Sequence, residues 1–299
     1  ATPVVTKKRI YVVAGDHGVT AEGVSAYPRE VTAQMVDNFL RGGAAINVLT
    51  RSGGIEVRVV DASVDADLTD RKGLIHAKTM RGTANFAVGP AMTRAEAEAC
   101  VAAGIELARV SASDGFHLLG IGEMGIGNTT AASAITSVLL ARDPETVTGR
   151  GTGIDDEGLV HKIAVIRRAI EINEPDVSDP LDVLAKVGGA EIAVMAGIVL
   201  GAAANHLPVV ADGFISSAAA ALAVAFEANA RDYLFNGHRS AERGHAALID
   251  FIGDQPLLDL SMRLGEGTGA ALAMHVIEAA AKLLSEMATF ADAGVSNKD

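Results

Sequence analysis

Short runs of apolar, β-branched residues alternate along this chain with glycine-rich turns and alanine-rich stretches, and this alternation limits the possible folds more than any other feature. The runs cover residues 9–13, 55–61, 116–121, 207–210 and 233–235. Their length and composition predict β-strands. Helical stretches separate most of them, and alternating strands and helices are typical of an α/β fold with a mainly parallel sheet.

Helices are predicted over the alanine-rich stretches between these strands, at residues 30–40, 43–51, 94–111, 155–172, 189–205 and 214–229. One more runs from the glycine loop at 122–130 to residue 142, and a closing helix ends near residue 288. Thr93 is the predicted N-cap of the 94–111 helix. Right-handed crossovers bring strand-to-helix turns to one edge of a parallel sheet, where ligands bind. We therefore expect several loops to meet there, at 15–18, 122–130, 211–213, 236–239 and 265–269.

The domain organisation is expected to be simple, because no linker or fixed-period repeat divides the chain. We expect one α/β catalytic domain over residues 1–268. The C-terminal helix, at 269–299, is expected to contribute to a small helical satellite domain.

The charge balance excludes several classes of binding protein. Lys and Arg number 25 against 37 Asp and Glu, a formal net charge of −12, which is unsuited to neutralising nucleic-acid phosphates or an anionic membrane surface. The longest apolar run, at 192–204, is too short to span a bilayer. The single cysteine, Cys100, excludes an internal disulfide and indicates a reducing compartment. Since the start of the sequence does not resemble a signal peptide, we expect a cytoplasmic protein that binds neither nucleic acid nor membrane.

The loop at 120–125 matches the pattern G-x-G-x-x-G between a predicted strand and a predicted helix. Backbone N–H groups at a helix N-terminus can hold a phosphate. A dinucleotide site also needs an acidic residue that ends a second strand about 20 positions on, and Asp143 has that spacing but lies in a turn-like sequence. A triphosphate P-loop needs a lysine where this chain has Asn128. The open interpretations are a mononucleotide or substrate phosphate site, a structural glycine turn and a dinucleotide site.

Asp16 and His17 stand between glycines after the first predicted strand, which suggests a metal ligand, an acid–base pair or a turn stabilised by the Asp side chain. The histidines of the chain form no i, i+4 pair and no H-E-x-x-H motif. The turn is therefore favoured, and we predict no metal site. A hydrolase nucleophile elbow is also unsupported, because G-x-S-x-G does not occur.

Glu123 and Glu266 are the carboxylates most suited to catalysis. Each lies in a glycine loop that follows a predicted strand, among small or apolar neighbours. Burial among such neighbours raises a carboxyl pKa towards neutrality, which suits a general acid or base. The alternative is that each carboxylate caps the N-terminus of the helix that follows it.

Taken in chain order, these loops resemble one protein family. The segments GDHGV, EGVS, VTAQM and GGAAIN, at 15–19, 22–25, 31–35 and 42–47, precede those at 122–130, 149–155, 211–213 and 263–269. The set is similar to that of the nicotinate-nucleotide–dimethylbenzimidazole phosphoribosyltransferases, over essentially the whole chain. Members of that family usually carry a helical segment before the first strand. This sequence begins almost at the strand, which predicts a trimmed N-terminus or a member without that segment.

The resemblance implies a Rossmann-like parallel sheet with a small helical domain, assembled as a homodimer that needs no cofactor. It implies transfer of the 5-phosphoribosyl group of nicotinate mononucleotide to 5,6-dimethylbenzimidazole or a related base, in cobalamin biosynthesis. The general base is the Glu of the L-G-E-G motif, here Glu266, and Glu123 lines the same site. Ser25 and Gln34 are implied to border the benzimidazole pocket. The remaining substrate contacts fall, by the same resemblance, on Gly125, Gly127, Asn128, Thr129, Gly151, Gly153, Lys162, Asp212, Arg263 and Leu264.

The implied chemistry suits these residues. Departure of the pyridinium nicotinate neutralises a positive charge, and the incoming azole is a weak nucleophile while its ring nitrogen keeps a proton. Glu266 is expected to take that proton as the other ring nitrogen attacks C1′ from the opposite face, with inversion. Two other functions stay open: a nicotinamide-dinucleotide-dependent oxidoreductase, and a non-catalytic paralogue, which would be expected to lose the glutamate of L-G-E-G.

Overall fold

A six-stranded parallel sheet organises the chain, in the strand order β3-β2-β1-β4-β5-β6. The computed structural model describes residues 3–253 and 255–296. The strands are β1 (Lys8–Gly15), β2 (Ile55–Ser63), β3 (Leu74–His76), β4 (Leu118–Met124), β5 (Val209–Ala211) and β6 (Leu234–Asn236). Every neighbouring pair runs parallel. The predicted α/β architecture is confirmed, with the strand order of a Rossmann fold.

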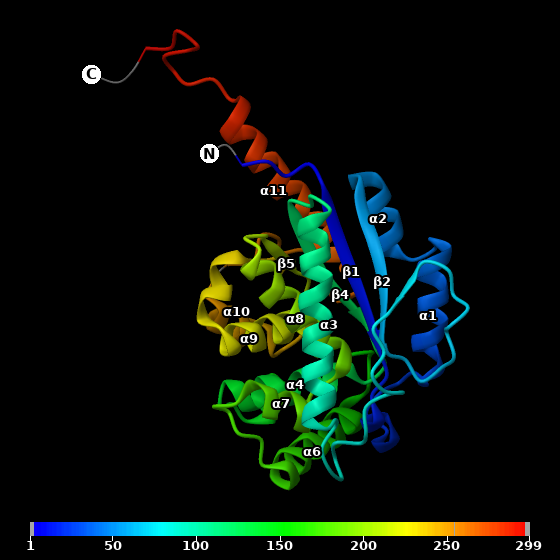
Figure 1. Ribbon diagram of the computed structural model, residues 1–299. Helices are drawn as coiled ribbons and strands as arrows, with labels where there is room; N and C mark the ends of the chain where they lie inside the picture. The colour runs from blue at the N-terminus through cyan, green and yellow to red at the C-terminus, as the bar shows by residue number, and fades with distance from the viewer. Residues whose placement is uncertain (1–2, 254, 297–299) are drawn as a thin grey trace.

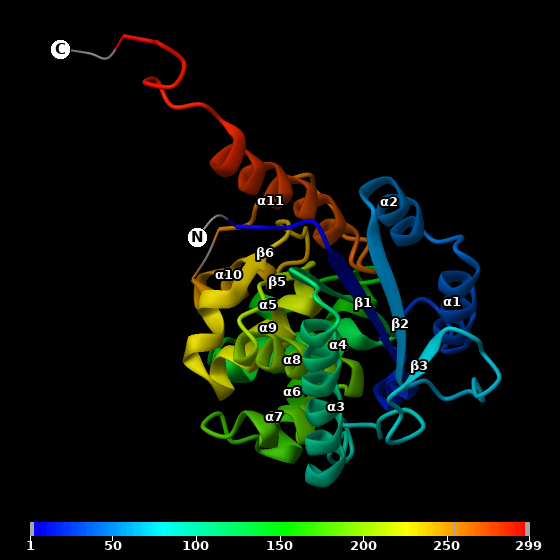
Figure 2. The ribbon, with the colours of Figure 1, turned by 45° about the horizontal axis from the view of Figure 1, so that its top comes forward.

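Helices cover both faces of this sheet (Figures 1 and 2). One face carries α1 (Glu30–Arg41), α2 (Ala45–Gly53) and α11 (Thr268–Glu286). The other carries α3 (Arg94–Ser113), α4 (Asn128–Leu139), α6 (Asp156–Asn173), α7 (Pro180–Val187), α8 (Ala190–Ala204), α9 (Phe214–Phe226) and α10 (His245–Ile252). The shorter α5 (Pro144–Val147) and the 3-10 turns η1 (Gly18–Glu22) and η2 (Ala228–Tyr233) lie in connections.

The central strand β1 shows why the strands are apolar along their whole length. All eight of its residues are buried, because helices exclude water from both faces. Successive side chains point to opposite faces. Tyr11 and Val13 accordingly pack in the cluster formed with α3, α8 and α9, whereas Ile10 and Val12 pack in the cluster formed with α1, α2 and α11.

The longer predicted elements are confirmed, and the unpredicted ones are short. Thr93 caps α3 as expected, because its side chain accepts the N–H of Glu96. β3, α5, α7 and α10 have three, four, eight and eight residues. Elements of this length carry too few residues for a periodic apolar pattern, and their formation depends on the neighbours that bury them.

β4 extends further than predicted, and this corrects the position of Glu123. The glycines of this segment suggest a loop from Gly122, but parallel pairing with β1 continues to Val13 opposite Glu123 and Ala14 opposite Met124. Glu123 therefore lies in the strand and not in a loop after it. Glu266 was also expected in a loop that follows a strand. This expectation is wrong, because residues 237–253 and 255–265 contain no strand.

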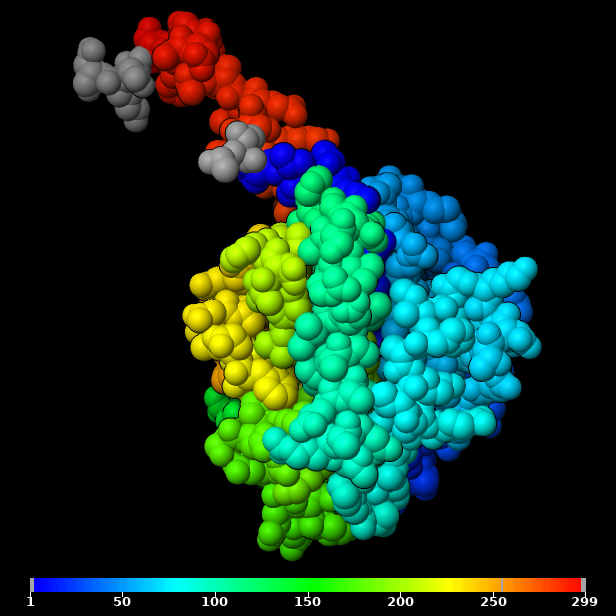
Figure 3. All heavy atoms as spheres, viewed as in Figure 1, coloured from blue at the N-terminus to red at the C-terminus, as the bar shows by residue number. Residues whose placement is uncertain are grey.

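The C-terminal helix α11 has a buried half and an exposed half. Ala270 and Met274 pack with Ile10 in the core beneath the sheet. Leu284 and Met287 are 75% and 71% exposed, and this end extends away from the sheet (Figures 1 and 3). The division of the chain at residue 268 stays a prediction. No helix in the described part of the chain is long and apolar enough to cross a membrane.

Candidate active site

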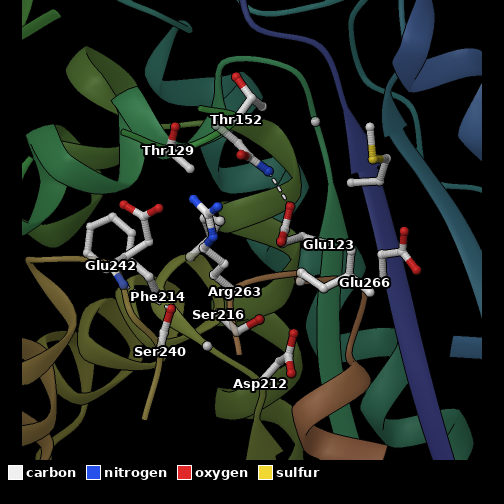
Figure 4. A pocket seen from close by; sticks show the side chains of 18 of the residues that line it. Glu123, Thr129, Thr152, Asp212, Phe214, Ser216, Ser240, Glu242, Arg263 and Glu266 are labelled. Atoms are coloured by element: carbon white, nitrogen blue, oxygen red, sulfur yellow. Dashed lines mark hydrogen bonds between the residues drawn. The ribbon is translucent and has the colours of Figure 1, made fainter. Parts of the chain in front are cut away.

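A cavity of about 260 Å³ opens at the carboxyl ends of β4 and β5. Its wall is built from the end of β4, the start of α4 and residues distributed over 151–152, 212–216, 238–242 and 263–266. Figure 4 shows Glu123, Asp212 and Arg263 around one space, with Glu266 beside Glu123. The predicted meeting of loops at this edge is therefore confirmed: the 15–18 loop packs against Gly125 and Gly127, and the other loops contribute residues to the cavity wall.

Glu123 is 8% exposed, near the end of β4. Asn128 donates a hydrogen bond to its Oε2 from the first turn of α4. Burial, reinforced by the negative charges of Asp212 and Glu191, raises the pKa of the Glu123 carboxyl to about 8. At neutral pH this carboxyl therefore holds a proton.

Glu266 lies in a left-handed turn. Its φ is 64°, between Gly265 at 81° and Gly267 at 87°, in a region that residues with side chains rarely adopt. Burial raises the pKa of the Glu266 carboxyl, the backbone N–H of Ile46 opposes this rise, and the charge of Asp212 adds to it. Its carboxylate is therefore a stronger base than one in water.

A corner suited to an anion lies at the start of α4. Lys162 of α6 is 1% exposed, and its Nζ donates to Thr129 Oγ1 over 2.8 Å. Burial lowers the pKa of Lys162 to about 8, against the opposing charge of Glu242, so the ammonium group still predominates at neutral pH. A Cβ added at Gly151 would lie 3.2 Å from that Nζ, so glycine keeps space beside the charge. Arg263 extends into the same space (Figure 4).

The backbone of this corner offers fewer free donors than its glycines suggest. Three N–H groups already have acceptors: Ile126 donates to Thr32 Oγ1, Asn128 to the Gly125 oxygen and Thr130 to the Gly127 oxygen. Gly127, at φ 94°, packs against His17 and does not line the cavity. The cationic side chains therefore provide more of the attraction for an anion than the helix N-terminus does.

Asp16 and His17 lie outside the wall of the cavity. His17 Nε2 is 2.7 Å from Glu191 Oε1, and both side chains are fully buried. Asp16 Oδ2 accepts the N–H of Asp65, which follows β2, so this side chain connects two loops and not, as predicted, the residues of its own turn. Among residues 3–253 and 255–296, no group of three or more His, Cys, Asp or Glu is arranged to hold a metal ion.

Comparison with known proteins decides the family. The model of a phosphoribosyltransferase family matches residues 1–295. The nicotinate-nucleotide–dimethylbenzimidazole phosphoribosyltransferase of Geobacter sulfurreducens is 58% identical, over 99% of this chain and 84% of its own length. The chain belongs to this phosphoribosyltransferase family. The protein of the same name from Chloroflexus aggregans is 56% identical, again over 99% of this chain and 84% of its own length.

Solved structures of the family share this fold. A structure of nicotinate-nucleotide–dimethylbenzimidazole phosphoribosyltransferase from Thermus thermophilus superposes with a TM-score of 0.94 at 49% identity, over 99% of this chain and 88% of that one. A structure of CobT from the same organism has a TM-score of 0.96 at 50% identity, over 99% and 89%. The resemblance in the loops is therefore a resemblance of the whole fold.

The cavity gathers most of the residues expected from the family motifs. Its wall contains Glu123 and Glu266 together with Gly125, Asn128, Thr129, Gly151, Asp212, Arg263 and Leu264. Lys162 stands behind the wall, through its bond to Thr129. Ser25, Gln34, Gly127 and Gly153 do not line this cavity. Ser25 is close to it, since its Oγ lies 3.3 Å from Oγ1 of the wall residue Thr152, whereas Gln34 is exposed on α1.

The rest of the wall falls into two groups. Met124, Ile126, Thr152, Gly213, His238 and Gly265 lie in segments that the sequence marked, whereas the sequence does not mark Phe214, Ile215, Ser216, Ser240 and Glu242. A signal existed for Phe214 and Ser216, because they begin α9 at the edge where ligands bind. Ser240 and Glu242 follow an irregular segment and reach the cavity only through the tertiary fold.

Proposed function

We propose that this protein transfers the 5-phosphoribosyl group of nicotinate mononucleotide to 5,6-dimethylbenzimidazole, or to a related base, with inversion at C1′. The products are α-ribazole 5′-phosphate and nicotinate, in cobalamin biosynthesis. Family membership supports this function. The observation that carries it is the cavity itself, where two buried carboxyl groups of raised pKa stand near a cationic corner.

Glu266 acts as the general base in this proposal. An azole becomes a good nucleophile when it loses its N–H proton, and a carboxylate of raised pKa accepts that proton readily. The electron pair of the other ring nitrogen then forms the bond to C1′. The bond from C1′ to the nicotinate nitrogen breaks at the same time, and its electron pair returns to the pyridine ring.

Glu123 acts as a neutral hydrogen-bond donor in this proposal. Because the pKa of its carboxyl is raised to about 8, it can donate a proton to a hydrogen bond without adding a second negative charge beside Glu266. Asn128 orients it through Oε2. A ribose hydroxyl is the substrate group that such a donor suits.

The 5′-phosphate is proposed to occupy the corner of Lys162, Thr129 and Arg263. An ammonium and a guanidinium group compensate phosphate charge, which a chain of net charge −12 supplies only locally. Gly125, Asn128 and the glycine loop of Gly151 and Gly153 are proposed to surround it. Ser25 and Gln34 stay predicted borders of the base pocket, and Leu264 stays a predicted substrate contact.

Product formation tests this function directly. The protein is incubated with nicotinate mononucleotide and 5,6-dimethylbenzimidazole, and α-ribazole 5′-phosphate is detected by mass spectrometry. Glu266→Gln keeps the shape of the side chain but removes the proton acceptor, so we expect kcat to fall roughly 10²–10⁴-fold with near-normal KM values. Glu123→Gln is expected to be milder. Wild-type turnover of Glu266→Gln, with chemistry rate-limiting, would exclude Glu266 as the base.

We also propose that the protein is a cytoplasmic homodimer. The exposed half of α11 supports the dimer. Leu283 and Leu284 on this half are 60% and 75% exposed, and Met287 directly after it is 71% exposed; exposed apolar surface is common at subunit interfaces. This half of α11 is the proposed contribution to a small helical domain. A light-scattering mass near that of one chain at micromolar concentration would contradict the dimer.

A further inference from the structure

The turn that carries Glu266 is held by a side chain from another part of the chain. Asp212, directly after β5, is 1% exposed. Its Oδ2 accepts the N–H of Gly267 over 3.0 Å, and its Oδ1 accepts those of Gly269 over 2.6 Å and Ala270 over 3.1 Å. N–H groups at the start of a helix have no partner inside that helix. One carboxylate thus closes both the N-terminus of α11 and the turn before it.

This turn needs external support. Glu266 is the middle one of three consecutive residues with positive φ, at 81°, 64° and 87°, and it alone has a side chain that resists this backbone. On its N-terminal side, the Gly265 oxygen accepts bonds from the N–H and the Oγ1 of Thr268. On its C-terminal side, Gly267 is held by Asp212. The hydrogen bonds on the two sides of Glu266 together fix the direction of its side chain.

The hydrogen bonds of Asp212 leave it little capacity for a substrate. Both of its oxygens accept backbone N–H groups, and His238 Nδ1 lies 3.7 Å from Oδ1. We propose that Asp212 is a positioning residue for Glu266 and does not bind the substrate. This inference rests on the proposed role of Glu266 as the base. Asp212 then affects turnover through Glu266, whose carboxylate it places and whose basicity its negative charge increases.

Asp212→Asn tests the role with the smallest change of shape. The amide oxygen can keep the N–H groups of Gly269 and Ala270, but the amide NH2 then meets the N–H of Gly267, donor against donor. The opposite orientation of the amide would create that conflict at two positions instead of one. Gly267, directly after Glu266, therefore loses its hydrogen bond to residue 212. We expect kcat to fall on the order of 10²-fold, as for a displacement of about 1 Å, with near-normal KM values.

A double-mutant cycle with Glu266→Gln separates positioning from direct contact. If Asp212 acts only through Glu266, Asp212→Asn causes no further loss of kcat in the Glu266→Gln background. The proposal would be overturned if kcat of the double variant were lower than that of Glu266→Gln by the factor that Asp212→Asn causes alone. A raised KM in Asp212→Asn would also overturn it, and both results would leave the base assignment intact. Wild-type turnover of Glu266→Gln would instead overturn the base assignment, and this positioning role with it.

Asp179→Asn is the matched control. Asp179 Oδ1 likewise accepts N–H groups at the start of a helix, those of Leu181 and Asp182 in α7, and Asp179 does not line the cavity. Asp179→Asn also loses the ion pair between Asp179 and Arg94, so we expect it to lower the unfolding midpoint slightly and to leave kcat unchanged. A loss of kcat in this control equal to that of Asp212→Asn would overturn the proposal, because the effect would then be one of general stability.

Thr268→Val covers the case in which Asp212→Asn does not fold. It preserves the shape of the side chain and removes the hydroxyl that donates to the Gly265 oxygen. We expect kcat to fall about fivefold, the effect of one neutral hydrogen bond, with no further loss in the Glu266→Gln background. A wild-type kcat for Thr268→Val would show that the turn does not need these hydrogen bonds to place Glu266, and would overturn the proposal.

Discussion

Gly122 of β4 is the point at which the sheet touches the Glu266 turn, and adding one methyl group there tests the arrangement of the two glutamates. A Cβ at this position would lie 2.2 Å from the nitrogen and 2.4 Å from the Cα of Gly267, and 2.6 Å from the carbonyl carbon of Glu266. All three atoms belong to the backbone, so no side chain can rotate away. The Gly122→Ala variant must therefore move either the strand or the turn.

The size of the effect follows from these distances. Ordinary van der Waals contact begins at 3.4 Å, so the turn must retreat by about 1 Å, a displacement that typically costs on the order of 10² in rate. Overpacking of this kind also costs about 1–3 kcal/mol of stability. We expect Gly122→Ala to lower kcat by that factor and to lower the urea midpoint, both measured on the folded enzyme with saturating substrates.

Gly89→Ala is the control for this prediction, because an added Cβ at Gly89 meets nothing within 4 Å. It is expected to keep wild-type kcat and to change stability by less than about 1 kcal/mol. If Gly122→Ala had wild-type kcat and stability, the turn could not be packed on β4 as described. If it lost stability but kept kcat per folded molecule, the position of Glu266 would not matter for the chemistry.

Two further predictions concern charge. Lys162→Met removes the ammonium beside Thr129, so the KM for nicotinate mononucleotide should rise roughly 10- to 100-fold; unchanged steady-state kinetics would contradict the phosphate corner. The pKa of Glu123 rises from 4.5 to about 8 on folding, so the folded state binds more protons between these values. The contribution of Glu123 protonation to the free energy of unfolding is complete below pH 4.5 and is lost as the pH rises to 8. The loss is at most about 1.4 kcal/mol per pH unit. The free energy of unfolding of the wild type, measured with urea, should therefore fall relative to that of Glu123→Gln as the pH rises across this range; a constant difference between the two would contradict the raised pKa.

The local pattern was sufficient to predict the architecture. Apolar runs of strand length separated by helical stretches predicted a parallel sheet, since a strand buried on both faces needs apolar residues at every position, as β1 shows. Thr93 marked the start of α3, because an N-cap depends only on residues close to it in the chain. The meeting of the loops at one edge followed from the handedness of the crossovers, which holds for any such alternation.

The tertiary structure decided how the site is built within that architecture. The sequence placed Glu123 in a loop, because it cannot show that pairing with β1 continues through this residue. It marked Asp212 as part of a glycine turn and, by resemblance, as a substrate contact. The three N–H groups that Asp212 accepts come from residues more than fifty positions away in the chain. Hydrogen bonds of that separation form only when the strands β5 and β4 and the start of α11 are brought to one edge.

For Glu266, the sequence and the tertiary structure each determined a part. Its motif, flanked by glycines, was recognisable from the sequence, because only glycine adopts positive φ without strain on both sides of the turn. The environment that makes it a base was not recognisable. The burial and the nearby charge of Asp212 that raise the pKa of Glu266 come from elements distant in sequence, and desolvation is a property of the surrounding packing and not of the residue itself.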